Sequence, residues 1–472
     1  MTSVLFVLDS PPQSGMSLAF FNSYIELLLE ILSSKVELTV FYPEFSDSKE
    51  LFALNIVQTP HYKLMTTYIP TRYETFSETY INERMDNVFD FILKEEHFDC
   101  VHIWSLKNHS FNYPFIAKER RIPVVCSVTD GFLFSNSLFE KGYPSSETPE
   151  TIRISNFIST SFSFFVKKLA LCFRPDNSHS FWFENIGRYS RYYNRSKSEA
   201  FTSTIKSERR DLTDDVINFC DRFIFFSQNE YQTFYKEVIP EHKIAVIDAG
   251  MLCDGTFENR PFEIEGAVKF GFMGEILPEE GIVELIDAFN LLYSQNYQNE
   301  LHIYGETHEN AQFVNRLKQR VKNTNVFFHG PIQPGRMNAA LNTFDALIIP
   351  AHWHRGDTFL VNNAIAARKC LVVSAGSVIA EKVRKSGRGL LLHEITAKSI
   401  ADAVSELERT RKKLYYFMRS TDNQPVPNVE DNASDLLEIY NSLKKDEPTD
   451  PSSLMLIRKF NKKRFERQRG QQ

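Results

Sequence analysis

The alternation of short apolar runs with longer amphipathic segments most constrains how this chain folds, because it occurs twice along the 472 residues. Four apolar runs in the first 130 residues predict strands at 4–8, 36–41, 100–104 and 123–128. Apolar residues at helical spacing predict helices at 18–32 and 81–95. Strands that alternate with helices form an open parallel sheet covered by helices, and ligands bind beyond the carboxyl ends of its strands.

The same order returns in the second half of the chain. Five further strands are predicted at 268–273, 301–304, 326–329, 346–349 and 371–374. Helices are predicted at 282–293, 311–321, 399–418 and 433–443. A polar stretch at 254–265, which contains Gly and Pro, marks the boundary between the two halves. Two open sheets in tandem predict an α/β protein with one central cleft.

These boundaries predict a first domain at 1–255 and a second at 256–418. A helical segment at 419–446 and a basic, mobile tail at 447–472 follow. Within the first domain, residues 134–215 form an aromatic and basic insertion. Its apolar side chains favour docking of an acceptor, a membrane surface or a partner chain, although an ordinary helical insertion packed on the domain explains them equally well.

The charge distribution limits the partners. The formal net charge is −6, yet residues 458–472 hold seven Lys or Arg against one Glu, so the rest of the chain carries −12. We therefore expect no nucleic-acid binding by the body of the protein. The tail has apolar residues between its cations and could lie on an anionic membrane, or it could be a disordered solvating tail.

Other sequence features place the protein in the cytoplasm, with any membrane contact peripheral. The N-terminus has no cationic region and only a five-residue apolar run, and no apolar stretch approaches the about 20 residues that span a bilayer. The six cysteines are scattered without metal-ligand spacing, so we expect reduced, mostly buried thiols. No cofactor and no catalytic metal are expected.

A family resemblance appears in an ordered series of segments. The segments GFMGEILPEEGIVELIDAF, LHIYGE, VFFHGPI and FDALIIPAHWHRGDTFLVNNAIAARKCLVVSAGS resemble the C-terminal half of family-4-like retaining glycosyltransferases. CVHIWS, RIPVVCSVTDGF and CDRFIFFSQNEYQTFYKEV resemble the first half in the same order. The resemblance implies a GT-B fold, with two Rossmann-like domains whose parallel sheets face a central cleft. It further implies a nucleotide sugar on the C-terminal domain, and a glycan, lipid or protein acceptor on the N-terminal one.

Two cations of the family pattern are replaced by anions. The family has an Arg after the first Gly of the second domain and a Lys before the next Gly, and these cations hold the sugar diphosphate. Gly274 and Gly281 are kept here, but Glu275 and Glu280 occupy the positions of the Arg and the Lys. Because the leaving diphosphate is negative, this reversal opposes its binding.

The family's pair of Glu residues, spaced by eight positions, is also missing. Read without a gap, the two positions are Arg355, where the family's Glu contacts the sugar, and Asn363, where it contacts the ribose. A shift in register would let Asp357 replace the first Glu but would leave the second without a carboxylate. The family's Gly at the end of the same helix falls on Arg368.

Four features are further candidates for the cleft. Arg355, beside His352 and His354, could supply a replacement cation, or it could lie in a surface loop. Gly376 precedes a helix whose backbone N–H groups could meet an anion. Gly15 lies where the family has a Gly-rich turn, and an ordinary turn explains it equally well. Asp130 is a candidate acceptor-side catalytic carboxylate.

Two functions follow from these residues. The chain is a glycosyltransferase with an altered donor site, or it is a catalytically inactive pseudo-glycosyltransferase that serves as an acceptor-binding or scaffolding subunit of an active homologue. The intact order of segments favours the first function, and the reversed charges favour the second.

Overall fold

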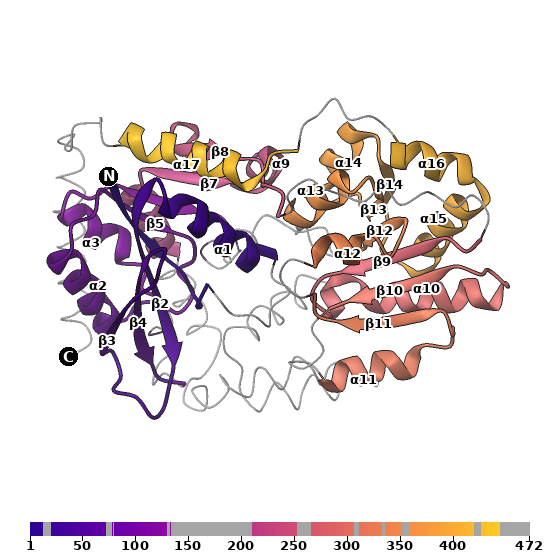
Figure 1. The fold of residues 1–472 in the computed structure, drawn as a ribbon, viewed down its shortest axis with the longest axis horizontal. Coiled ribbons are helices and arrows are strands. Elements are labelled where there is room, and N and C mark those ends of the chain that lie inside the picture. The colour runs from indigo at the N-terminus through magenta and orange to yellow at the C-terminus, as the bar shows by residue number, and fades with distance from the viewer. Residues whose placement is uncertain are drawn as a thin grey trace.

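Two sheets organise the chain, and Figure 1 shows them side by side along its longest axis. The computed structural model describes residues 1–12, 20–71, 78, 80–129, 133, 210–252, 266–305, 311–332, 336–351, 358–419 and 426–443. All statements below concern these residues. Most of the predicted insertion 134–215 and the predicted tail 447–472 lie outside them. The predicted α/β class with largely parallel sheets is confirmed.

The first sheet has eight strands in the order β3-β4-β2-β1-β5-β6-β7-β8. Their bounds are β1 Thr2–Val7, β2 Val36–Phe45, β3 Leu54–Gln58, β4 Lys63–Ile69, β5 Cys100–Ile103, β6 Val124–Ser127, β7 Arg222–Phe225 and β8 Ile244–Val246. Neighbouring strands are parallel except β3 and β4, which form an antiparallel hairpin. We did not predict this hairpin, because its residues lie in a polar stretch and β3 has no fully buried side chain.

Helices cover both faces of the first sheet. One face holds α2 (Glu83–Glu95), α3 (Tyr113–Glu119) and the helical residues 210–219, whose apolar side chains form one core with the sheet. The other face holds α1 (Phe20–Ser33). Helix α2 begins at Asn82, whose side chain accepts hydrogen bonds from the N–H groups of Arg84 and Met85.

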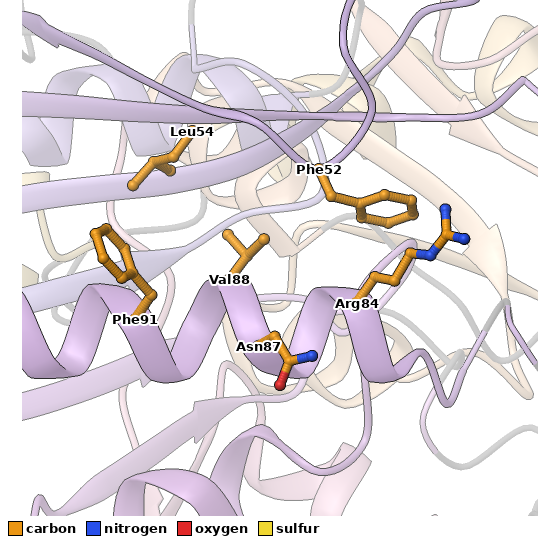
Figure 2. A pocket seen from close by; sticks show the side chains of 6 residues that line it. All are labelled: Phe52, Leu54, Arg84, Asn87, Val88 and Phe91. Carbon is orange, nitrogen blue, oxygen red and sulfur yellow. The ribbon is translucent and has the colours of Figure 1, made fainter.

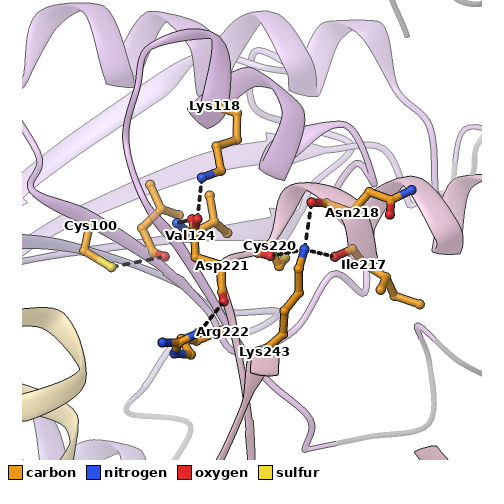
Figure 3. Close-up of polar contacts among 10 residues, drawn as sticks. Cys100, Lys118, Val124, Ile217, Asn218, Cys220, Asp221, Arg222 and Lys243 are labelled. Atoms are coloured by element: carbon orange, nitrogen blue, oxygen red, sulfur yellow. Dashed lines mark hydrogen bonds and ion pairs between the residues drawn. The ribbon is translucent and has the colours of Figure 1, made fainter. Parts of the chain in front are cut away.

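Partly buried polar contacts connect β6, β7 and the helical residues 210–219 (Figure 3). Asp221 accepts from Lys118 Nζ at 2.5 Å and from the N–H of Val124 at 2.8 Å. Lys243 Nζ donates to the carbonyls of three residues at the end of that helix, namely Ile217, Asn218 and Cys220. Burial lowers the Lys243 pKa. The ammonium group also stabilises the C-terminus of this helix, because it bonds the last carbonyls and faces the negative end of the helix dipole.

The second sheet has six strands, all parallel, in the order β11-β10-β9-β12-β13-β14. Their bounds are β9 Lys269–Met273, β10 Glu300–Tyr304, β11 Val326–Gly330, β12 Ala346–Ile349, β13 Cys370–Ser374 and β14 Gly389–Leu392. The helices between and after them are α10 Ile282–Ser294, α11 Ala311–Arg320, α12 Met337–Leu341, α13 Thr358–Ala366, α14 Ala380–Ser386, α15 Ala397–Arg409 and α16 Arg411–Arg419. The helical stretch predicted at 399–418 is confirmed as two helices, because Thr410 leaves the helical conformation and separates α15 from α16.

The last described helix, α17 (Val429–Leu443), returns from the second sheet to the first, where Figure 1 shows it in yellow. It packs against α1, and the Tyr440 hydroxyl lies 2.6 Å from Nδ1 of the buried His102 on β5. Tyr24 of α1 donates to the Asn432 side chain at 3.0 Å. Helix α17 is therefore part of the layers around the first sheet. In the described part of the chain, no helix is long and apolar enough to cross a membrane.

Candidate functional site: the donor-side turn and helix α13

The turn between β9 and α10 contains four of the predicted donor-cleft residues. Gly274 follows β9, and its N–H donates to the Tyr304 carbonyl at 3.2 Å. A short 3-10 turn, Pro278–Glu280, leads to Gly281 at the start of α10. Gly281 has a φ of +70°, and a Cβ there would collide with the Pro350 carbonyl oxygen. The turn therefore needs glycine at position 281 for both its conformation and its packing.

The charges around this turn are negative. Glu275 is exposed, Glu280 is partly buried, and Glu284 lies in the first turn of α10. Acidic side chains near a helix N-terminus stabilise the helix through its dipole. The same charges oppose a bound diphosphate. The structure thus places Glu275 and Glu280 on one turn but does not show what that turn binds.

Asn363, at the position where the resemblance implies a ribose-binding Glu, is fully buried in α13. Its Nδ2 donates to the Phe359 carbonyl at 2.7 Å, and its Oδ1 accepts from the N–H of Leu252 at 3.2 Å. Its neighbour Asn362 donates to the Ala249 carbonyl. Both amide side chains therefore bond the segment 248–252, which follows the first sheet.

The segment 248–252 is held from the opposite side by α17. Asn432 Nδ2 donates to the Asp248 carbonyl at 2.9 Å, and Asn432 Oδ1 accepts from the N–H of Gly250 at 2.7 Å. The Asp248 carboxylate forms an ion pair with Lys382 of α14. Burial lowers the Lys382 pKa, and the facing carboxylate opposes that shift.

Sequence reasoning did not identify Asp248, Lys382 or Asn432. The available signal was the run IDAGM directly after β8, which combines an acidic residue with a glycine at the end of a strand. A Cβ on Gly250 would collide with the carbonyl group of Asn428, so this segment also depends on glycine.

Aromatic side chains join α13 to the first sheet and its helix α1. The Phe359 ring lies 4.4 Å from Tyr24 and 5.2 Å from Phe226, measured between ring centroids. Trp104, which is buried, stacks on His102 at 4.2 Å. Trp104 Nε1 has no hydrogen-bond partner among the residues that the structure describes. Helix α13 thus contributes to one apolar core that extends over both halves of the chain.

Gly376 lies in the turn after β13, and α14 begins four residues later, at Ala380. Gly376 therefore precedes a helix, as predicted, and turn and bend residues 375–379 separate it from the first residue of α14. The Val378 carbonyl accepts from Asn229 Nδ2 at 3.2 Å, which ties this turn to the segment after β7. Anion binding at Gly376 stays a prediction.

Several predicted residues lie outside the described ranges: Gly15, Asp130, His352, His354, Arg355 and Asp357. The described cysteines Cys100, Cys126, Cys220 and Cys370 are buried, as predicted. Within the described ranges, no group of three or more His, Cys, Asp or Glu side chains could hold a metal ion.

Comparison with known proteins gives this geometry a context. Residues 256–422 match the family model of glycosyl transferases group 1. The chain is 24% identical over 178 residues to lipopolysaccharide 1,2-N-acetylglucosaminetransferase of Salmonella typhimurium, which covers 34% of this chain and 46% of that protein. The chain thus spans about half the length of this curated relative.

Solved structures resemble almost the whole chain. Sucrose-phosphate synthase from Thermosynechococcus elongatus aligns with a TM-score of 0.65 and 13% identity, covering 94% of this chain and 99% of that one. Anabaena Alr3699/HepE, solved with UDP and glucose, aligns with a TM-score of 0.58 and 11% identity, covering 94% and 100%. At these identities the likeness shows the fold.

Proposed function

We propose that this chain, which has the GT-B fold and whose residues 256–422 belong to the glycosyl transferases group 1 family, recognises a glycosyl acceptor without holding a nucleotide sugar in the family's way. It acts as the acceptor-binding or scaffolding subunit of an active transferase. The observation that carries this proposal is the burial of Asn363 between α13 and the segment 248–252.

The charge of the donor-side turn supports the proposal. A sugar diphosphate needs cations or free N–H groups around its phosphates. Glu275 and Glu280 occupy the two cation positions of the family pattern, and Glu284 adds a third carboxylate to the start of α10. Bringing a diphosphate next to these carboxylates costs on the order of a few kcal/mol before salt screening.

The hydrogen bonds of Asn363 support it independently. A ribose-binding carboxylate must present oxygen atoms to two hydroxyl groups in the cleft. Both ends of the Asn363 amide already have backbone partners, and the side chain is wholly buried. The residue therefore stabilises the junction of the two halves of the chain.

An altered but active donor site is the second candidate, in which the chain transfers a sugar from a nucleotide sugar to a glycan, lipid or protein. The glycines of the donor-side turn favour it, because Gly274 and Gly281 match the family pattern and Gly281 adopts a left-handed conformation against Pro350. Arg355, outside the described residues, would supply the missing cation. We expect no metal in either case. We place the protein in the cytoplasm, with the basic tail as its membrane contact.

A turnover assay separates the two candidates. The purified chain is incubated with UDP-, GDP- and ADP-sugars and a glycan and lipid extract of its native cell, and nucleoside diphosphate release is measured. We expect release at the level of buffer alone, and co-purification of a second glycosyltransferase with the chain from that cell. Saturable release by the chain alone would establish the altered transferase instead.

A further inference from the structure

The edge strand β3 differs from the other sheet edges that the described residues form. Natural sheets protect their edges with short strands, bulges, charges or proline. Strand β8 has three residues, β14 has four, and the pairing of β11 with β10 contains an irregularity in register. Strand β3, with the sequence LNIVQ, has five residues, no charge and no proline. Its regular pairing with β4 leaves its other edge without a neighbouring strand among the residues that the structure describes.

A groove runs beside this strand, between β3 and α2 (Figure 2). Its volume is about 420 Å³, and its lining is Phe52, Leu54, Arg84, Asn87, Val88 and Phe91. The figure shows Phe52 near Arg84 at one end, Leu54 near Phe91 at the other, and Val88 between them. The Arg84 guanidinium lies 5.4 Å from the centroid of the Phe52 ring. The groove is thus mainly apolar, with one cation at its end.

Exposed apolar side chains occur on β3 and on nearby segments of the chain, and those of Ile56 and Val57 point to opposite faces of β3. Twelve large apolar side chains are exposed among the described residues, and five of them belong to the end of β2, the following loop, β3 and α2. These five are Phe45, Leu51, Ile56, Val57 and Phe91. Ile56 is 53% exposed and Phe91 is 50% exposed. Scattered apolar side chains are common on protein surfaces, whereas a gathering beside an open strand edge is typical of an interaction surface.

We propose that β3 pairs in antiparallel orientation with β3 of a second copy of this chain, across a two-fold axis perpendicular to the sheet. An axis in this direction leaves α2 of both copies on the same face of the joined sheet. The exposed Phe91 of each copy then reaches towards the groove of the other. The pairing joins two eight-stranded sheets edge to edge. Ile56, the central residue of β3, lies at the axis opposite Ile56 of the other copy.

A second copy suits this surface for two reasons. Strand β3 carries no charge, so its pairing with an identical strand brings no like charges together. The protruding Phe91 and the groove that can receive it lie on the same surface, as a two-fold interface requires. Stable interfaces bury about 800 Å² on each partner, which exceeds what a five-residue strand supplies. We therefore expect reversible association in the micromolar range.

Sedimentation velocity across low to high micromolar concentrations of the full chain tests the proposal. We expect the wild type to form a dimer as concentration rises. Ile56→Lys should weaken dimerisation at least tenfold, because two lysines then face each other across the axis. Tyr416→Lys is the control, since Tyr416 is 65% exposed on α16, far from β3 along the chain, and its substitution should leave dimerisation unchanged.

A charge-complementation experiment makes the test specific to the pairing of β3. Ile56→Lys and Ile56→Glu should each be monomeric, and an equimolar mixture should recover the dimer. Hydrogen exchange at the β3 amides should slow as the wild type dimerises. A monomer at all concentrations would overturn the proposal, as would a dimer that both Ile56 variants leave intact. Slow exchange of these amides in a monomer would assign the edge to another segment or partner and would also overturn it.

Discussion

The donor-side turn and helix α13 correspond, through the family resemblance, to two parts of one donor site, but they differ in how their side chains are used. In the turn, Glu275 is exposed, and the backbone shape depends on Gly281. In α13, Asn363 is buried and bonded to the backbone of Leu252. We therefore expect the charge of Glu275 to change without affecting the fold. The α13 position cannot change in the same way, because it holds the two halves of the chain together.

The largest expected effect comes from Asn363→Glu, which restores the family's carboxylate. The new carboxylate would be buried, and it would replace an amide whose nitrogen donates to the Phe359 carbonyl, so we expect a loss of about 3–5 kcal/mol in the free energy of unfolding. Denaturant titration at pH 7 measures it. Glu275→Asn is the matched exposed change and should stay within about 0.5 kcal/mol. Equal effects of the two variants would remove the distinction between α13 and the turn.

The next largest effect is expected from lowering the pH, which should reduce the free energy of unfolding through two buried histidines. Burial lowers the pKa of His109 to about 4, and that of His102, which contacts Tyr440 of α17, well below its usual range. The folded state keeps both histidines neutral near pH 5, whereas the unfolded chain binds a proton on each of them. The free energy of unfolding is therefore highest above about pH 6.5 and falls as the pH decreases towards 4. For His109 the loss reaches about 3 kcal/mol.

Denaturant titrations from pH 7 to pH 4 check this dependence. The His109→Gln variant is less stable at pH 7 but should lose less stability than the wild type as the pH falls. Identical slopes for the variant and the wild type would show that His109 does not titrate on unfolding in this range.

A smaller effect is expected at the end of α13, from Arg368→Gly. Arg368 is exposed and has a φ of +55°, in the left-handed region that favours glycine. The substitution should raise stability by about 1 kcal/mol through relief of this strain. Arg368→Ala removes the same cation but keeps a Cβ, so it should bring no comparable gain. An equal gain from alanine would assign the effect to charge, including that of the neighbouring Arg388.

The smallest change in stability is expected for Glu275→Arg. This side chain is exposed, and the shape of the turn depends on the backbone at Gly281, so the free energy of unfolding should change by less than about 0.5 kcal/mol. Thermal unfolding of the variant and the wild type measures this. A large loss would show that the Glu275 carboxylate holds the turn, in contrast to the role of Gly281.

The sequence predicts the buried strands well, because their apolar runs have no other stable environment. Strands β9, β10, β12 and β13 lie within one residue of their predicted positions. The β3–β4 hairpin was missed because its pattern is partly exposed. The resemblance located Asn363, but its partner Leu252 lies 111 residues away, so no local pattern could predict that hydrogen bond. The return of α17 to α1 was missed for the same reason.

Calorimetric titration of UDP into the wild type and into the double variant Glu275→Arg, Glu280→Lys tests the central claim most directly. Under our proposal, the negative charge of the donor-side turn prevents the binding of a nucleoside diphosphate. The wild type should show no saturable binding, and the double variant should bind at least about tenfold more tightly, a gain of about 1.4 kcal/mol. Saturable binding to the wild type, or no gain in the double variant, would contradict the claim.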